Sequence, residues 1–125
     1  MAVTYTTAVK NARLDAVTAQ IDAGSGSGYI EIGTTSMGTV LATITLSDPA
    51  APAASGGVLT FTMPKSDTDA DNTGTAAEAV IKDSDGTTVI SGLTVSTSGA
   101  DINLDSVSIT AGQTVTLSSA TITHA

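Results

Sequence analysis

The chain has 125 residues and a formal net charge of −8, and only Lys10, Arg13, Lys65 and Lys82 are positive. Phosphate contacts dominate nucleic-acid affinity and need a basic surface, so we expect no binding to DNA or RNA and repulsion from anionic membranes. The chain contains no cysteine, which excludes disulfides, thiolate metal sites and a cysteine nucleophile.

The composition favours β-structure around a core of small aliphatic side chains. Threonine occurs 23 times and alanine 19 times, whereas there are only two tyrosines, one phenylalanine and no tryptophan. β-Branched residues suit a pleated strand, so the core must come from Val, Ile, Leu and Ala. No apolar run approaches the roughly 18 residues that a membrane-spanning helix needs. We expect a single domain over residues 1–125, because this is a common domain length.

Residues 6–23 form the one predicted helix. Thr6 or Thr7 is suited to cap its N-terminus, and Gly24 is suited to the C′ position that ends it. Apolar residues recur at helical spacing and predict the buried stripe, with Leu14 beside it: Val9, Ala12, Ala16, Val17 and Ile21. Residues 1–5 precede the helix as an extended arm, which either adds to a neighbouring sheet or is a frayed terminus.

Residues 29–123 are predicted to form a β domain. Alternating apolar and polar residues indicate strands at 29–32, 40–46 and 59–63, the last ended by Pro64. Prolines and glycines predict a loop over residues 48–57, and residues 66–75 read as an acidic loop.

A hairpin and an internal repeat follow. Asp85-Gly86 is a turn signal between predicted strands at 79–82 and 87–90, and Gly92 interrupts the pattern that follows. Residues 99–111 resemble residues 112–124, which indicates two similar paired strands unless the Thr- and Ser-rich segments match by chance. Because a strand cannot change phase without a bulge or bend, we expect one near 105–106 and another near 118–119.

Several short strands at intervals of about ten residues are typical of a sandwich. We therefore expect a mainly β fold, an antiparallel β-sandwich or jelly-roll-like domain with one N-terminal α-helix. The helix is expected to pack on one edge of the domain or to cross to a neighbouring subunit.

The inventory of reactive side chains argues against an enzyme. His124 is the one histidine, and it stands next to the C-terminal residue. A general base must be held within hydrogen-bond reach of its substrate, which a chain end rarely achieves. We expect no catalytic residues, no cofactor-binding residues and no cofactor.

The acidic loop is the sharpest candidate for ligand chemistry. Asp67, Asp69, Asp71 and Glu78 stand at positions 1, 3, 5 and 12 of an EF-hand-like spacing, although Asn72 takes the place of the usual glycine. Either these carboxylates bind a cation such as calcium, or the loop is a solvated acidic segment, and we assign no metal site. The neighbouring run 83–86 is explained by turn chemistry alone.

Strings along nearly the whole chain resemble small virion proteins of tailed phages, of the kind encoded near the major capsid gene. The resemblance runs through Met1-Ala2-Val3-Thr4-Tyr5 and the Ala-rich helix, Ile30-Glu31-Ile32-Gly33, Thr73-Gly74-Thr75-Ala76-Ala77, Ser98-Gly99-Ala100-Asp101-Ile102 and Ile109-Thr110-Ala111-Gly112-Gln113-Thr114-Val115. None of these strings is a chemical signature, and no residue-level binding site carries over.

This resemblance implies a head decoration (cement) protein that sits on capsid capsomers as a dimer or trimer. The implied partners are the major capsid protein or other virion subunits, and the implied location is the phage capsid surface after assembly in the host cytoplasm. A tail or fibre protein, or an adhesin-like module that recognises a host glycan or protein, is the alternative.

Overall fold

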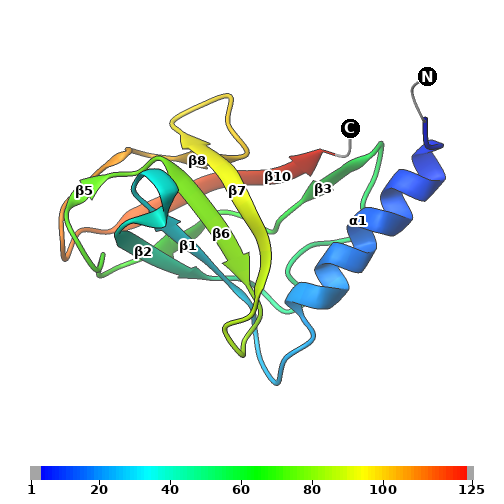
Figure 1. The fold of residues 1–125 in the computed structure, drawn as a ribbon, viewed down its shortest axis with the longest axis horizontal. Helices are drawn as coiled ribbons and strands as arrows, with labels where there is room; N and C mark the ends of the chain where they lie inside the picture. The colour runs from blue at the N-terminus through cyan, green and yellow to red at the C-terminus, as the bar shows by residue number, and fades with distance from the viewer. Residues whose placement is uncertain (1–3, 124–125) are drawn as a thin grey trace.

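The computed structural model describes residues 4–123, which form one α-helix, a short 3-10 turn and ten strands (Figure 1). Their bounds are α1 Thr7–Ile21, β1 Tyr29–Gly33, η1 Thr35–Met37, β2 Val40–Thr45, β3 Val58–Thr60, β4 Lys65–Asp67, β5 Gly74–Thr75, β6 Glu78–Lys82, β7 Thr88–Ser96, β8 Ile102–Leu104, β9 Ser108–Ile109 and β10 Val115–Thr123. The expected mainly β fold with one N-terminal helix is confirmed.

Eight of the strands form one curled sheet: seven follow the order β2-β1-β6-β7-β8-β10-β3, and β4 lies off this path and pairs with β10. β10 has β8 along one edge, and its other edge pairs first with β4 and then with β3. The pairs are antiparallel except β7 with β8, which run parallel over two residues each. The sheet curls until β2, at one end of its order, lies beside β4, which pairs with β10. The result is a sandwich-like fold.

The hairpin and the internal repeat lie as the sequence indicates. β6 and β7 pair antiparallel around the turn at Gly86, which has a φ of +87°, and Gly92 lies in a bulge of β7. The two repeats supply β8 and β10, which pair with Leu104 opposite Leu117, and β10 has a bulge between Leu117 and Ser119. β8 ends at Leu104, so the predicted corner near 105–106 is also present.

The acidic segment, predicted as a loop over residues 66–75, is a loop only over residues 68–73. Within residues 66–75 lie part of β4, which pairs with β10, and all of β5, which pairs with β9. Gly74 lies so close to Leu41 that a Cβ there would come within 3.0 Å of the leucine side chain. The segment therefore covers the outer face of β2, where Leu41 is fully buried. The predicted strand at 59–63 is also shorter, because β3 ends at Thr60.

The helix is slightly shorter than the predicted 6–23, and its C-terminal signal was misread. Thr6 is the N-cap, and its hydroxyl accepts a hydrogen bond from the Val9 N–H at 3.3 Å. The C-cap is Asp22, so Gly24 is not the C′ residue. Gly24 is instead required by a close approach, since a Cβ there would lie 1.7 Å from the Ser84 hydroxyl oxygen.

The buried face of the helix keeps only the C-terminal part of the predicted stripe, Val17 and Ile21, and Leu14 completes it. Leu14 and Ile21 are buried, and Val17 packs partly against the core. Val9 is 42 % exposed, and Ala12 and Ala16 are also exposed. Leucine and isoleucine remove more apolar area from water than alanine does, so the stripe with the larger side chains takes the inner face.

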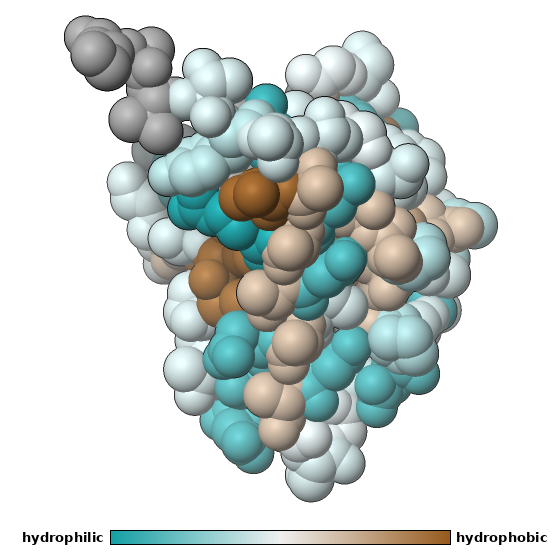
Figure 2. Space-filling view, turned by 90° about the vertical axis from the view of Figure 1, so that its right-hand side faces the viewer, coloured by the Kyte–Doolittle hydropathy of each residue, from teal (hydrophilic) through white to brown (hydrophobic). Residues whose placement is uncertain are grey.

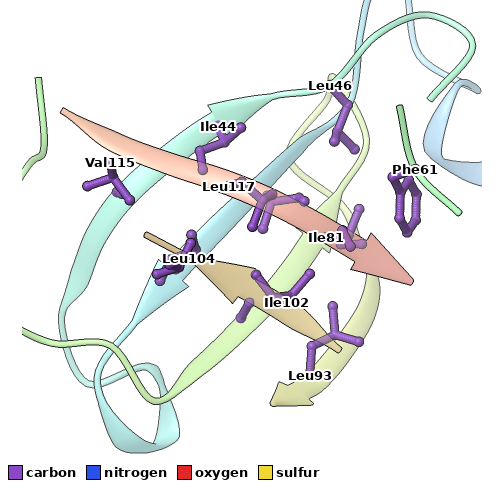
Figure 3. Close-up of a cluster of buried hydrophobic side chains, with 14 of the residues drawn as sticks. Ile44, Leu46, Phe61, Ile81, Leu93, Ile102, Leu104, Val115 and Leu117 are labelled. Atoms are coloured by element: carbon purple, nitrogen blue, oxygen red, sulfur yellow. The ribbon is translucent and has the colours of Figure 1, made fainter. Parts of the chain in front are cut away.

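The core is aliphatic apart from one ring, as the composition indicates. Figure 3 shows side chains of β2, β6, β8 and β10 pointing into the space enclosed by the curl, with Phe61 at one end of the cluster and Val115 at the other. Among residues 4–123, the buried side chains are apolar. The side-chain hydrogen bonds among these residues therefore involve exposed or half-buried groups.

Truncating the two faces of α1 tests which one is inside. We expect Leu14→Ala to lower the free energy of unfolding by about 2–4 kcal/mol, because it removes buried area and leaves a cavity. The matched change Val9→Ala should alter it by less than about 0.5 kcal/mol, since the site is exposed and alanine favours helix. Urea denaturation of both variants measures this difference, and a larger loss for Val9→Ala would place that residue in the core.

Candidate functional site

Three residues that follow one another at and after the end of β4, namely Asp67, Asp71 and Asn72, bind the free edge of β2, and we call this line of contacts the seam. Asp67, at the end of β4, accepts a hydrogen bond from the Thr43 N–H through Oδ2 at 3.0 Å. Its other oxygen, Oδ1, accepts one from the Asp69 N–H at 3.0 Å, which shapes the turn that follows β4. The carboxylate thus holds β2 to β4 where no strand ladder joins them.

The next residues continue this seam. The Asp71 N–H donates to the Leu41 carbonyl at 2.7 Å, and the Asn72 side-chain amide donates to the Val40 carbonyl at 2.8 Å. The Thr43 hydroxyl donates to Asp71 Oδ2 at 3.3 Å. Backbone groups of an edge strand must find partners, and here side chains and a turn supply several of them.

The EF-hand-like spacing does not produce a cation site in this structure. Asp67 lies on β4, whereas Glu78 lies on β6 and pairs with Gly33 and Thr94 of the two neighbouring strands. Within residues 4–123, no three His, Cys, Asp or Glu side chains gather closely enough to hold a metal ion. The spacing places the carboxylates along a seam and on a separate strand, because strands rather than helices flank the segment.

A second carboxylate shapes the hairpin turn. Asp83 Oδ1 accepts hydrogen bonds from the N–H groups of Asp85 at 3.0 Å and Thr87 at 2.9 Å. Turn chemistry is therefore sufficient to explain the acidic run at 83–86.

A third carboxylate fastens the short connection between the parallel strands β7 and β8. Asp101 Oδ2 accepts hydrogen bonds from the N–H and the hydroxyl of Thr94, both at 3.1 Å, while the Asp101 N–H donates back to the Thr94 hydroxyl oxygen at 3.0 Å. Parallel strands normally need a long crossover. This reciprocal pair, seven residues apart, holds the chain in a tight loop instead.

The polar flank of α1 holds the loop over residues 48–57. Asn11, Asp15 and Asp22 accept hydrogen bonds from the N–H groups of Gly57 at 2.9 Å, Ala54 at 2.7 Å and Ala50 at 3.2 Å. Burial raises the pKa of the Asp22 carboxyl above its usual 3.8, the hydrogen bond from Ala50 opposes this rise, and the nearby charge of Asp48 adds to it.

The basic residues also have local partners. The Lys82 ammonium lies 2.6 Å from the Glu31 carboxylate, and this hydrogen bond raises the pKa of Lys82 above its usual value. The Arg13 guanidinium stacks over the Tyr5 ring at 4.7 Å from its centre, a cation–π contact.

The surface formed by residues 4–123 contains no pocket. His124 lies outside the described residues. No helix in the described part of the chain is long and apolar enough to cross a membrane. A scan against protein-family models, a search of curated proteins and a search of solved structures each found no match to this chain.

Sequence reasoning missed the role of the aspartates as acceptors for backbone N–H groups. One signal was present, because Asp67-Thr68-Asp69 and Asp83-Ser84-Asp85 both place an aspartate two residues before the N–H that it accepts. The bonds from Thr43 to Asp67 and from Ala54 to Asp15 join distant parts of the chain, so no local sequence pattern predicts them.

The seam can be tested by removing its central carboxylate. We expect Asp67→Ala to lower the free energy of unfolding by about 1–2 kcal/mol, because two backbone N–H groups lose a charged acceptor at a partly exposed site. Asp69→Ala is the matched control, since it removes the same charge from the same segment and its carboxylate accepts no hydrogen bond within residues 4–123. Urea denaturation compares the two variants, and equal losses would show that charge rather than hydrogen bonding matters there.

The raised pKa of Asp22 predicts a pH-dependent cost. A carboxyl whose pKa is higher in the folded state contributes stability below its unfolded pKa of about 3.8 and loses it as pH rises through the folded value. Asp22→Asn keeps an acceptor for the Ala50 N–H and removes this loss. It also removes a negative charge from the C-terminal end of α1, which stabilises by about 0.3–1 kcal/mol. Thermal melts should show that Asp22→Asn gains stability relative to wild type from pH 3 to pH 7, and a constant difference would contradict the assignment.

Proposed function

We propose that this chain is a non-enzymatic structural protein of a tailed-phage virion, and that it decorates the head by binding the lattice of the major capsid protein. The observation that carries the proposal is how the side chains are used. One aspartate in each of four places accepts backbone N–H groups: Asp67 at the seam, Asp83 at the hairpin turn, Asp101 at the β7–β8 connection and Asp15 on the α1 flank. These carboxylates therefore stabilise the fold, as we expect of polar side chains in a structural subunit.

The outer surface supports a role in protein contact. Strands expose hydroxyl side chains at Thr60, Thr88, Ser108 and Thr123, and α1 exposes apolar residues to solvent. Exposed hydroxyls and small apolar faces suit contact with another protein surface, and many copies that each bind one lattice weakly gain from multivalent engagement. The proposal of a phage head, rather than of another assembly, rests on the resemblance to small virion proteins.

The competing tail, fibre or adhesin function would be favoured if the acidic loop bound calcium. Asp67 and Asp71 lie on the seam with Thr43, and Glu78 lies on β6. No observation on the structure favours this alternative over the head.

Binding to isolated heads tests the proposal. We expect the purified chain, added to heads that lack it, to appear as extra density at regular lattice positions in cryo-electron microscopy and to raise the temperature at which the heads release DNA. Heads that already carry the protein are the matched control and should gain no density. Unchanged heads together with binding to tails or to host cells would overturn the head assignment in favour of the tail or adhesin function.

A further inference from the structure

The outward face of α1 is apolar along its whole length. Positions 9, 12, 16 and 19 carry valine and three alanines, and all four are exposed. The opposite face, at Leu14, Val17 and Ile21, packs on the β domain. The helix therefore has two apolar faces, and the fold uses one of them.

The spacing on the outer face is that of a helix-pairing seam. Steps of three and four residues alternate from Val9 to Ala19, which is the a and d pattern of a heptad repeat. Tyr5 continues the same spacing just before the helix, and Tyr5 and Val9 are the large hydrophobic residues that residues 4–123 leave exposed. Figure 2 shows this apolar band running down the side of the molecule formed by α1, between hydrophilic flanks.

The two flanks of this band carry different charges. Taking Val9 and Ala16 as a positions puts Arg13 and Gln20 on the e flank, and Asp15 and Asp22 on the g flank. In a parallel pair the e flank of one helix meets the g flank of the other, whereas in an antiparallel pair like flanks meet. The arginine and the aspartates are therefore complementary only when the two helices run in the same direction.

The part of the chain that contains α1 also differs from the β domain in its net charge. Residues 1–28 contain two basic and two acidic residues, whereas residues 29–125 contain two basic and ten acidic residues, so the net charge of −8 lies in the β domain. Two copies repel each other through their β domains, and this repulsion is weakest where the α1 helices face each other.

We propose that α1 is a self-association surface, through which a second copy of this chain pairs its own α1 in parallel along Val9, Ala12, Ala16 and Ala19. Alanines allow the two helix backbones to approach closely. Arg13 of each copy then lies beside the acidic flank of the other, where Asp15 keeps its bond to the Ala54 N–H and has lone pairs free to accept more. A face of this size buries less than about 1,200 Å² in total, so the pair is weak and depends on concentration. It does not depend on binding to a capsid.

Cysteine cross-linking tests the pairing and its direction, because the chain has no cysteine of its own. In a parallel pair each position meets itself, so we expect Ala19→Cys to form disulfide dimers under mild oxidation at least tenfold faster than Thr75→Cys. Thr75 is an exposed residue of β5, which Figure 1 places at the opposite end of the molecule from α1. Equal rates would overturn the proposal. So would a Val9→Cys and Ala19→Cys mixture that cross-links while Ala19→Cys alone does not, because that pattern is antiparallel.

A charge placed in the band provides the second arm. We expect Ala16→Glu, added to the Ala19→Cys chain, to reduce the rate of dimer formation at least tenfold, whereas Thr75→Glu in the same background should leave it unchanged. Ala16 is exposed and glutamate is a good helix former, so the helix should remain folded, and circular dichroism checks this. An Ala16→Glu chain that stays folded and cross-links as fast as its parent would show that the band is not the contact.

Discussion

The closure of the curled sheet between β2 and β4 is the constraint on which the rest of this fold depends. An aliphatic interior stabilises the chain only while its apolar area, at roughly 25 cal/mol per Å², stays out of water. β2 ends the sheet order and has a strand ladder along one side only. Along the other side, Asp67 and Asn72 bind its backbone groups, so the edge is partly satisfied without offering a continuous ladder to another chain.

Local chemistry was enough to predict the elements whose structure is decided locally. The Asp85-Gly86 turn, the Thr6 cap and the alternation over 29–32 each follow from preferences within a few residues, and all three are present. The β10 bulge near Ser118 was also predictable, because the apolar residues change phase there and a strand must bend to keep them inside.

The errors occurred where a distant partner decides the structure. Lys65-Ser66-Asp67 has no apolar alternation and becomes a strand because β10 pairs with it. Two apolar stripes on α1 fit the helical period, and the choice between them depends on the volume that β3 and the core leave for Leu14 and Ile21. Gly24 looks like a helix stop in the sequence, but it is explained by contact with Ser84, 60 residues further along the chain. The positions of the acidic side chains were also not predictable, because Glu78 lies on β6 while Asp67 ends β4, and these strands are placed by their distant partners.

The same constraint governs what surface remains for association. β3, the other end of the sheet order, is covered by α1, and Asn11, Asp15 and Asp22 of the helix fasten the loop that leads into it. Groups of the same chain therefore cover both ends of the sheet order, and residues 29–125 carry the whole net charge of −8. A second copy cannot readily add a strand to either edge, and it is repelled by most of the surface. The outer face of α1, which is apolar and lies in the part of the chain with no net charge, is left as the surface where two copies can meet.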